Sequence, residues 1–218
     1  LSIQGQGSKA FHGEKPRGEP LSTLGWDGVL SYEPSELVVR VRTGTRLAEV
    51  EAVLAEQGQC LPFEPPHFSE NSTIGGIVAA GLSGPSRATA GAVRDYILGV
   101  NLINGKGDYL SFGGQVMKNV AGYDVSRLLP GSMGTLSLLL EASVKVLPKP
   151  AATATLRCHT TQEKALKLLN EWAGQPLPLS ASCWIGNANS DGELTIRLAG
   201  AVAAVKSATP LMSAQVNA

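Results

Sequence analysis

The stretch from Thr73 to Gly84, TIGGIVAAGLSG, constrains the fold most, because it places four glycines and no charged residue in the middle of the chain. Glycine loses more conformational freedom on folding than other residues, so such a cluster indicates tight turns or close approach of the backbone to a ligand. Ser72 or Thr73 can cap a short helix over residues 74–80. Free N–H groups at its start would favour an anion. The alternative is a glycine-rich helix packed against a neighbour, and the stretch alone does not decide.

Length and composition allow one large domain or two small ones. The chain has 218 residues, of which 43% are hydrophobic, and a formal net charge of +0. This balance argues against a nucleic acid or another polyanion as partner. The longest apolar runs, such as residues 136–140, are too short to span a bilayer, and no signal peptide is visible. The chain starts at Leu1, inside an expected strand, which leaves room for a missing upstream segment.

The three cysteines are widely spaced and form no CxxC pair, so neither a zinc site nor a disulfide framework is expected. Cys60 stands beside Leu61, and Cys183 stands beside Trp184. We therefore expect these two cysteines to be small buried side chains. Such usage, with Cys158 as the third, is typical of a reducing cytoplasm.

The pattern of apolar residues up to residue 149 predicts a mixture of strands and short helices. Helices are expected at residues 45–56, with Thr45 as cap, and at residues 123–129. Asn104-Gly105-Lys106-Gly107 predicts a hairpin turn. Strands are expected at residues 1–3, 37–42, 96–103, 108–112 and 136–146.

The last third of the chain has a different texture, and Pro148 and Pro150 place a domain boundary near residue 150. Strands are expected at residues 153–158, 182–185 and 193–198, and helices at residues 162–172 and 201–212. This β-α-β-β-α order predicts a small α+β layer that ends without an obvious completing strand.

The first glycine loop, Gly5-Gln6-Gly7-Ser8-Lys9, follows an expected strand. Successive backbone N–H groups in such a turn can form a concave nest for a phosphate. The spacing is not that of a P-loop, and no long helix opens there about twenty residues before an acidic ribose partner, so a Rossmann site is not expected. The alternative is an ordinary strand-to-loop turn.

Two further segments combine glycines with polar residues. Residues 87–99 form a small-residue loop that enters an apolar strand, with Arg94 and Asp95 just before it. The alternative is that these two charges form a surface ion pair, which contributes little to stability. Residues 118–124, KNVAGYD, precede a glycine element at residues 131–136, GSMGTL, which again places glycine backbone beside hydroxyl groups.

In this order, the segments resemble the FAD-binding domain of vanillyl-alcohol-oxidase-like and p-cresol-methylhydroxylase-like (PCMH-type) flavoproteins. In that family, a glycine loop near the first strand and a P-x-x-x-x-T-I-G-G-like segment, here ending at Gly76, hold the FAD pyrophosphate. Residues 91–99 and 131–136 match two further family elements. The resemblance covers about residues 1–150.

The implied fold class is α+β. A two-subdomain PCMH-type FAD-binding domain would occupy residues 1–149, followed by the start of a small α+β, ferredoxin-like cap domain at residues 150–218.

KNVAGYD followed by GSMG resembles the branch of FAD-linked 2-hydroxyacid oxidases. Residues 5–11 and the run PFEPPH at residues 62–67 are most similar to the smaller FAD-binding subunits of bacterial glycolate oxidases. The resemblance implies an FAD-dependent oxidoreductase subunit acting on glycolate or a related 2-hydroxy acid, in a complex with a larger FAD subunit and an iron–sulfur subunit. It also implies a cytoplasmic protein, and allows contact with the inner membrane face through that complex.

The chain departs from the family in two respects. Many relatives carry a histidine in the first glycine loop that bonds covalently to the flavin, whereas Ser8 stands near that place here, so we expect non-covalent FAD. The family's substrate-oxidising residues belong largely to the cap domain, which ends here soon after it begins, so no catalytic base is predicted. His12, His67 and His159 form no metal-binding pattern, and we expect no metal.

The residues expected to contact FAD share glycine backbone, a hydroxyl group or a place in the matching segments. They are Gly5, Gln6, Gly7, Ser8, Lys9, Pro65, Thr73, Ile74, Gly75, Gly76, Gly81, Gly84, Gly91, Asp95, Gly134, Thr135 and Leu136. Two other interpretations stay open. One is a scaffold subunit whose partner carries the active site. The other is a nucleotide-sugar reductase of the same fold, against which the KNVAGYD segment argues.

Overall fold

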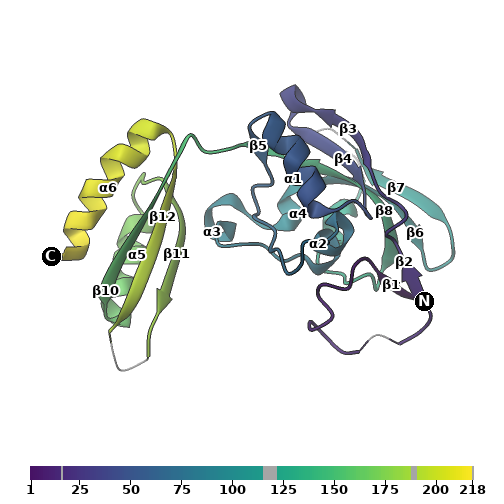
Figure 1. Ribbon diagram of the computed structural model, residues 1–218, viewed down its shortest axis with the longest axis horizontal. Coiled ribbons are helices and arrows are strands. Elements are labelled where there is room, and N and C mark those ends of the chain that lie inside the picture. Colours follow the sequence, from purple (N-terminus) through teal and green to yellow (C-terminus); the bar gives the residue numbers. More distant parts are fainter. Residues whose placement is uncertain (16, 115–121, 188–190, 218) are drawn as a thin grey trace. The chain divides into compact units, whose positions relative to one another are not determined.

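The computed structural model describes residues 1–15, 17–114, 122–187 and 191–217. Contacts divide the chain into two units, each of which is described by itself (Figure 1). The first unit comprises Leu1–Gly84 and Gly91–Pro148, and the second comprises Pro85–Ala90 and Lys149–Ala218. That residues 1–149 and residues 150–218 fold as two separate domains stays a prediction.

A five-stranded antiparallel sheet forms the centre of the first unit. Its strand order is β3-β4-β8-β6-β7. The β6–β7 hairpin turns at residues 104–107, as predicted, with the Asn104 N–H donating to the Asp108 carbonyl at 3.1 Å. The strands are β3 (Val29–Glu33), β4 (Val38–Arg42), β6 (Ile97–Asn104), β7 (Tyr109–Gly113) and β8 (Ser137–Lys145).

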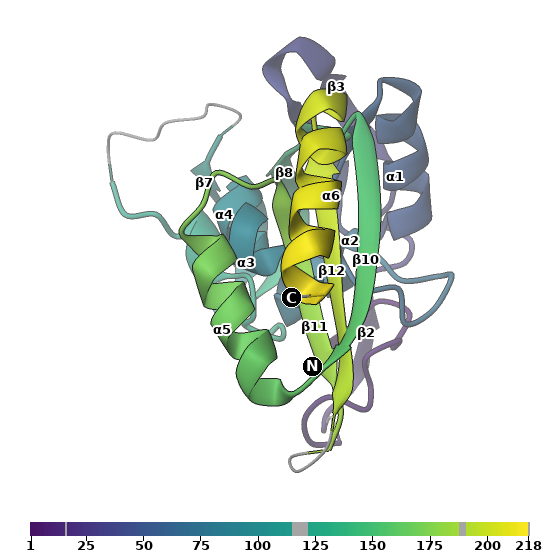
Figure 2. The same ribbon diagram turned by 90° about the vertical axis from the view of Figure 1, so that its left-hand side faces the viewer.

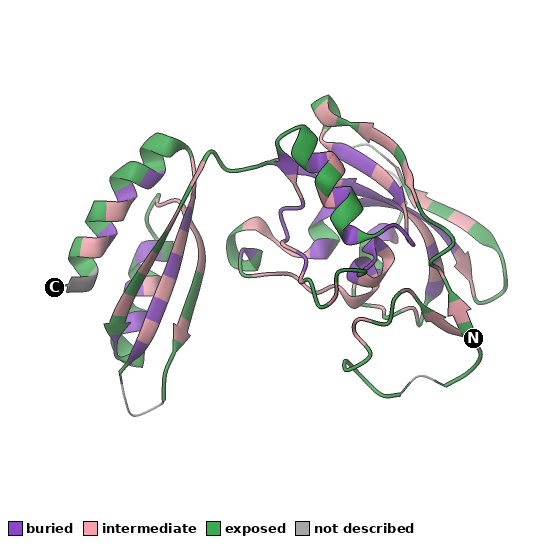
Figure 3. Cartoon of the chain, in the orientation of Figure 1, coloured by how far each residue is buried: buried purple, intermediate pink, exposed green. Residues whose placement is uncertain are grey.

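Helices α1 (Leu47–Glu56), α2 (Ile74–Ala80) and α4 (Val93–Tyr96) contribute buried side chains to the core of this unit. Short 3₁₀ helices occupy Pro34–Glu36 (η1) and Ser126–Leu128 (η2). The buried residues gather where these helices meet the sheet (Figure 3). Core members include Val39, Val41, Leu47, Val50, Leu54, Phe63, Ile74, Ile77, Val100 and Val144.

Two small strand pairs complete the first unit. Strand β1 (Ser2–Gln4) pairs in parallel with β2 (Pro20–Ser22), so the loop between them leaves the pair and returns to it. Strand β5 (Gln59–Cys60) pairs with β9 (Leu147–Pro148). Because β1 ends at Gln4, the first glycine loop starts directly at the end of a strand.

The second unit is a three-stranded antiparallel sheet with two helices packed against it (Figure 2). Its strands are β10 (Ala152–Thr160), β11 (Leu179–Ile185) and β12 (Gly192–Gly200), in the order β10-β12-β11. Helices α5 (Gln162–Ala173) and α6 (Val202–Asn217) supply Trp172 and Met212 to the core. The short helix α3 (Arg87–Ala90) contacts β11.

Three expectations about local structure differ from the structure. The helix expected from Thr45 begins at Leu47, because the Thr45 hydroxyl donates to the Arg42 carbonyl at 2.7 Å instead of capping. The helix expected at residues 123–129 is only the turn η2. Cys183 is exposed, because it pairs with Thr195 on the sheet face away from the core.

Candidate functional site

A cavity of about 550 Å³ in the first unit brings together segments that are far apart in the sequence. Its walls come from the loop after β1, the end of β4, helix α2 and the turn before β8. Figure 1 shows β1 and its loop beside α2 and the start of β8. Ten of the predicted FAD residues line it: Gly5, Gln6, Gly7, Ser8, Lys9, Thr73, Gly75, Gly76, Gly134 and Thr135.

The loop after β1 brings unused backbone donors to this cavity. The loop is held by two turns, in which the N–H of Ala10 donates to the Gly7 carbonyl and the N–H of His12 donates to the Lys9 carbonyl. Gly7 has a φ of 71°, a left-handed conformation that glycine adopts readily. The N–H groups of residues 5–9 donate to no described residue. Consecutive free N–H groups in such a loop form a site for an anion.

The start of α2 differs from the prediction. Thr73 caps the helix as expected, its Oγ1 accepting from the Gly76 N–H at 3.2 Å. The N–H groups of Ile74 and Gly75 donate to the carbonyls of Thr45 and Thr43, at 2.9 and 2.8 Å. The prediction that the first N–H groups of this helix are free for an anion is therefore wrong, because the segment after β4 and the Thr73 cap already accept their hydrogen bonds.

The glycines around this helix start have separate roles. A Cβ on Gly75 would lie 2.7 Å from both the Cβ and the carbonyl oxygen of Thr43, so Gly75 allows close packing on the end of β4. A Cβ on Gly76 would approach Thr73 Oγ1 to 3.3 Å and Lys9 Nζ to 3.8 Å, on the cavity side. A Cβ on Gly5 would lie 2.6 Å from Thr73 Oγ1, which shows how closely the first loop approaches the helix cap.

Among the described lining residues, Lys9 is the one lysine or arginine, and the other titratable side chains are those of His12 and Glu14. Its ammonium lies near Gly76 and 5.9 Å from the centre of the Phe68 ring. Burial lowers the pKa of the Lys9 ammonium below its usual range, since removal of water disfavours the charged form. A bound anion would oppose that shift and gain a charge-assisted hydrogen bond.

The turn before β8 provides the opposite wall. The N–H of Met133 donates to the Ala79 carbonyl at 2.9 Å, which fixes the turn to the end of α2. Gly134 has a φ of 75° and its neighbour Thr135 also lines the cavity. Ser137 lines it too, and its buried hydroxyl has no partner among the described residues.

Ser8 lies beside Ser72. The Ser72 hydroxyl donates to Ser8 Oγ at 3.2 Å, which connects the first loop to the residue before the α2 cap. His67, in the proline-rich run, instead contacts Glu51 on α1 at 3.1 Å, so it is a satisfied surface histidine.

Seven predicted residues lie outside the lining of this cavity as the described residues define it. Gly81 ends α2 with a φ of 64°, and a Cβ there would lie 2.7 Å from Gly131 N. A Cβ on Gly84 would lie 2.5 Å from the Glu64 carbonyl. Asp95 accepts a 2.8 Å hydrogen bond from a backbone N–H three residues earlier, rather than forming the expected ion pair. The seven are Pro65, Ile74, Gly81, Gly84, Gly91, Asp95 and Leu136.

Several lining residues were missed by the sequence analysis. His12 and Glu14 lie in the loop between β1 and β2, Thr23 directly follows β2, and Thr43 directly follows β4. Only the first loop offered a sequence signal, since His12 and Glu14 lie just after it. Residues 118–121 of the KNVAGYD segment lie outside the described residues.

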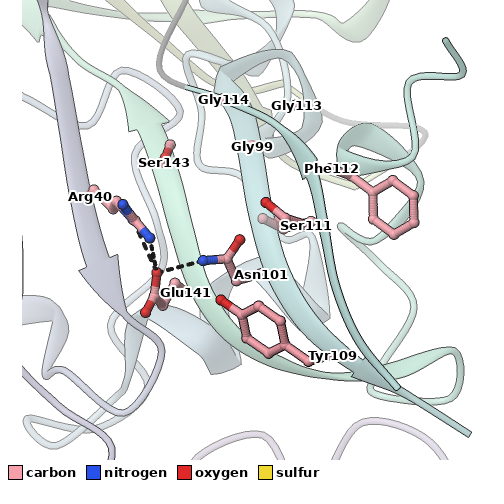
Figure 4. A pocket seen from close by; sticks show the side chains of 11 residues that line it. Arg40, Gly99, Asn101, Tyr109, Ser111, Phe112, Gly113, Gly114, Glu141 and Ser143 are labelled. Atoms are coloured by element: carbon pink, nitrogen blue, oxygen red, sulfur yellow. Dashed lines mark hydrogen bonds and ion pairs between the residues drawn. The ribbon is translucent and has the colours of Figure 1, made fainter. Parts of the chain in front are cut away.

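A second cavity, of about 370 Å³, lies over strands β4, β8, β6 and β7 (Figure 4). There Glu141 Oε2 accepts hydrogen bonds from Arg40 Nε at 3.0 Å, Arg40 Nη2 at 2.5 Å and Asn101 Nδ2 at 2.8 Å. The three side chains come from three neighbouring strands, so this network stabilises their register. Its residues were not predicted as functional.

The sequence family described as an FAD binding domain matches residues 1–113, more than half of the chain. This chain therefore belongs to the FAD-binding domain family. The predicted family, the α+β fold class and the cofactor FAD are confirmed.

Similar proteins include glycolate oxidase subunits. The chain is 48% identical over 215 residues to "Glycolate oxidase subunit GlcE" of Escherichia coli, covering 99% of this chain and 60% of that protein. It is 34% identical over 128 residues to "Glycolate oxidase subunit GlcD" of Bacillus subtilis, covering 59% and 27%. The chain thus spans about three fifths or less of these relatives.

A solved structure of alkyldihydroxyacetonephosphate synthase shares the fold. Its TM-score is 0.73 at 18% identity, and the match covers 91% of this chain and 41% of that one.

The described residues that line the cavity are suited to binding FAD. The free N–H groups of residues 5–9 and the Lys9 ammonium suit a pyrophosphate, and the glycines leave room for it. In the described part of the chain, no helix has the length and apolar character needed to cross a membrane, and no three histidine, cysteine or acidic side chains gather as a metal site.

Proposed function

We propose that this chain is the FAD-binding subunit of a 2-hydroxyacid oxidase or dehydrogenase, and that the substrate is glycolate or a related small 2-hydroxy acid. The similarity to GlcE over 99% of the chain supports this proposal. The observation that carries the FAD-binding part is the row of backbone N–H groups at residues 5–9 that donate to no described residue, beside the Lys9 ammonium.

In this proposal, the chain's own residues hold and orient the cofactor. The N–H groups of residues 5–9 bind the pyrophosphate, and Lys9 donates to one of its oxygens. Gly76 leaves the space beside Lys9 open. Gly134 and Thr135, on the opposite wall, contact the adenosine half. Bound FAD supplies the redox chemistry by accepting electrons from the substrate.

We propose that FAD is held without a covalent bond. Ser8 stands where many family members have the histidine that bonds to the flavin, and its hydroxyl contacts Ser72. A serine hydroxyl is a weak nucleophile at its ordinary pKa unless a base activates it. Acid precipitation of the FAD-loaded chain should therefore leave all flavin in the supernatant, and flavin in the pellet would contradict this.

We also propose that this chain acts in a complex with other subunits. The names of the relatives, subunits GlcE and GlcD, support a complex of several subunits. We propose a larger FAD subunit and an iron–sulfur subunit as partners, with the complex in the cytoplasm at the inner membrane face. Co-purification of a tagged chain from its native cells, followed by mass spectrometry, should recover both subunits, and recovery of neither would contradict the complex.

A scaffold role is the second candidate. The described cavity lining has only Lys9, His12 and Glu14 as titratable groups, and none is positioned by a hydrogen-bonded partner as a catalytic base would be. Turnover of glycolate with an artificial electron acceptor separates the two candidates. An FAD-loaded chain that adds to the turnover of its partners supports the first role. An FAD-free chain that restores full turnover supports the scaffold.

Binding of FAD is tested by titrating the cofactor with the chain and following flavin fluorescence. Quenching that saturates at one FAD per chain is expected. Absence of saturable quenching by a chain whose circular dichroism shows it to be folded would contradict the proposal.

A further inference from the structure

One face of helix α2 lies along the cavity of about 550 Å³. Gly76, Ala79 and Ala80 line the cavity and are only partly buried, whereas the three buried residues of the helix pack into the core. Positions three and four apart share one face of a helix. Because Gly76 lies beside Lys9, Ala79 lies about one helical turn, roughly 5 Å, further along the cavity.

The turn that contains Met133 lies at that further point. The Met133 N–H donates to the Ala79 carbonyl at 2.9 Å, and both residues line the cavity. A Cβ on Gly134 would lie 3.7 Å from the Cβ of Ile3, which is another lining residue. The side chains of Ile3, Ala79 and Met133 are apolar, in contrast to the backbone donors and the ammonium of residues 5–9. The cavity therefore offers an apolar surface about one helical turn from its anion-binding loop.

The backbone of Met133 has a conformation that methionine rarely adopts. Met133 has a φ of 53° and Gly134 has a φ of 75°. The Thr135 N–H donates to the Ser132 carbonyl at 3.0 Å, so these two residues are the centre of a turn with positive φ at both positions, as in type I′. Glycine, asparagine and aspartate dominate such positions. Any longer side chain costs free energy there, because its Cβ crowds the following carbonyl oxygen.

Packing within the described residues does not offset this cost. Leu37 and Glu64 are the other described non-glycine residues with a left-handed φ, at 56° and 47°. Leu37 packs against the core, and Glu64 is half-buried, with its Cβ 2.7 Å from where a Cβ on Gly84 would lie. The Met133 side chain, in contrast, is 42% exposed. Strained residues of this kind cluster at ligand sites, where a bound molecule uses the side chain.

We propose that the Met133 side chain covers one face of the adenine ring of bound FAD. This inference rests on the proposed function, in which the pyrophosphate lies on residues 5–9. Adenine is joined to the pyrophosphate through a single ribose, whereas the isoalloxazine is joined through the longer ribityl chain. The shorter arm suits an apolar surface one helical turn away. Ala79 and Ala80 leave room for the flat ring, and the flexible thioether of methionine makes favourable contacts with aromatic rings.

The first test uses oxidation of methionine as a footprint. Hydrogen peroxide converts an exposed methionine to its sulfoxide, and mass spectrometry follows the rate at Met133 in the dark. Met212, which is 0% exposed, is the internal control. The chain is compared free, saturated with FAD, and with ADP at a concentration that displaces FAD. Because ADP carries adenine without isoalloxazine, both ligands should slow oxidation of Met133 at least about fivefold.

The outcomes of the footprint separate the two proposals. An unchanged oxidation rate of Met133 in the FAD-saturated chain would overturn the adenine contact. Protection by FAD without protection by ADP would overturn it too, because the isoalloxazine would then be the group on Met133. A folded chain without saturable binding of FAD is a different result, which overturns the proposed function and this inference with it.

The second test substitutes Met133. Met133→Gly removes the side chain and the backbone strain, so the midpoint of urea unfolding should not fall. Its dissociation constant for FAD should nevertheless rise about three- to tenfold, since part of an apolar side chain no longer covers the ring. Met133→Leu keeps an apolar cover and the strained backbone, and should bind FAD within about twofold of the unmodified chain. Equal FAD affinity of Met133→Gly and the unmodified chain would overturn the proposal, whatever the stability of the variant.

Discussion

Two adjacent glycines at the start of α2 give the sharpest test of how the site is built. Gly75 and Gly76 have the same side chain and are neighbours in one helix, but their missing Cβ atoms face different surroundings. A Cβ on Gly75 would meet Thr43, at 2.7 Å from both its Cβ and its carbonyl oxygen. A Cβ on Gly76 would meet no atom closer than Thr73 Oγ1 at 3.3 Å, and would lie 3.8 Å from Lys9 Nζ.

The two alanine substitutions therefore have different expected effects on the free energy of unfolding. Gly75→Ala must push the end of β4 away, and overpacking of this kind costs about 1–3 kcal/mol. Alanine is favoured over glycine within a helix by about 0.5–1 kcal/mol, which offsets part of that cost at Gly75. For Gly76→Ala, the helix preference of alanine stabilises the chain, and the small shift that the new methyl group forces on the Thr73 hydroxyl destabilises it. The free energy of unfolding should therefore change by less than about 1 kcal/mol.

The effect of Gly76→Ala on FAD should be larger than its effect on folding. The added methyl group takes up space beside Lys9, where we place a pyrophosphate oxygen. Weakening one charge-assisted hydrogen bond of about 1.5–3 kcal/mol lowers affinity roughly tenfold or more. Urea unfolding monitored by circular dichroism measures stability, and flavin fluorescence measures affinity. A Gly76→Ala chain that loses stability as Gly75→Ala does, yet binds FAD normally, would refute this assignment.

Three further predictions concern Lys9, Thr73 and Trp172. Lys9→Met should weaken FAD binding about tenfold. Burial lowers the Lys9 pKa below the usual lysine range, and FAD favours the charged form of Lys9. The FAD affinity of the unmodified chain should therefore fall as the pH rises through that pKa. The same fall in affinity in a Lys9→Met chain would contradict this prediction. Thr73→Val removes the α2 cap and should cost about 1 kcal/mol in urea unfolding, and an unchanged midpoint would argue against the cap. Trp172→Ala empties a buried site in the second unit and should cost about 3–5 kcal/mol in thermal unfolding, while a loss under about 1 kcal/mol would contradict the packing.

Local signals in the sequence predicted the elements well where neighbours in the chain decide the structure. Helix α2 and its Thr73 cap were predicted because capping and apolar spacing act within a few residues. The 104–107 hairpin turn was predicted for the same reason. Thr45 looked like an equally good cap, but its hydroxyl bonds to the carbonyls of Arg42 and Gly28, so the chain around it overrides the local preference.

The site itself could be predicted only in part. The first loop and the GSMGTL turn carry their glycines in recognisable order, and both line the cavity. Which N–H groups are free could not be predicted, because Thr43 and Thr45 approach α2 from about thirty residues away. The role of Gly81 likewise depends on Gly131, fifty positions further along the chain, so its glycine was attributed to the ligand and not to packing.

The central claim is that the loop after β1 holds the FAD pyrophosphate on its backbone N–H groups. Isothermal titration of the chain with FAD and, separately, with riboflavin tests this directly, because riboflavin carries the same ring without the pyrophosphate and the adenosine attached to it. We expect one FAD to bind per chain, with riboflavin at least about a hundredfold weaker because it leaves the N–H groups of residues 5–9 unused. Equal affinities for FAD and riboflavin would contradict the claim.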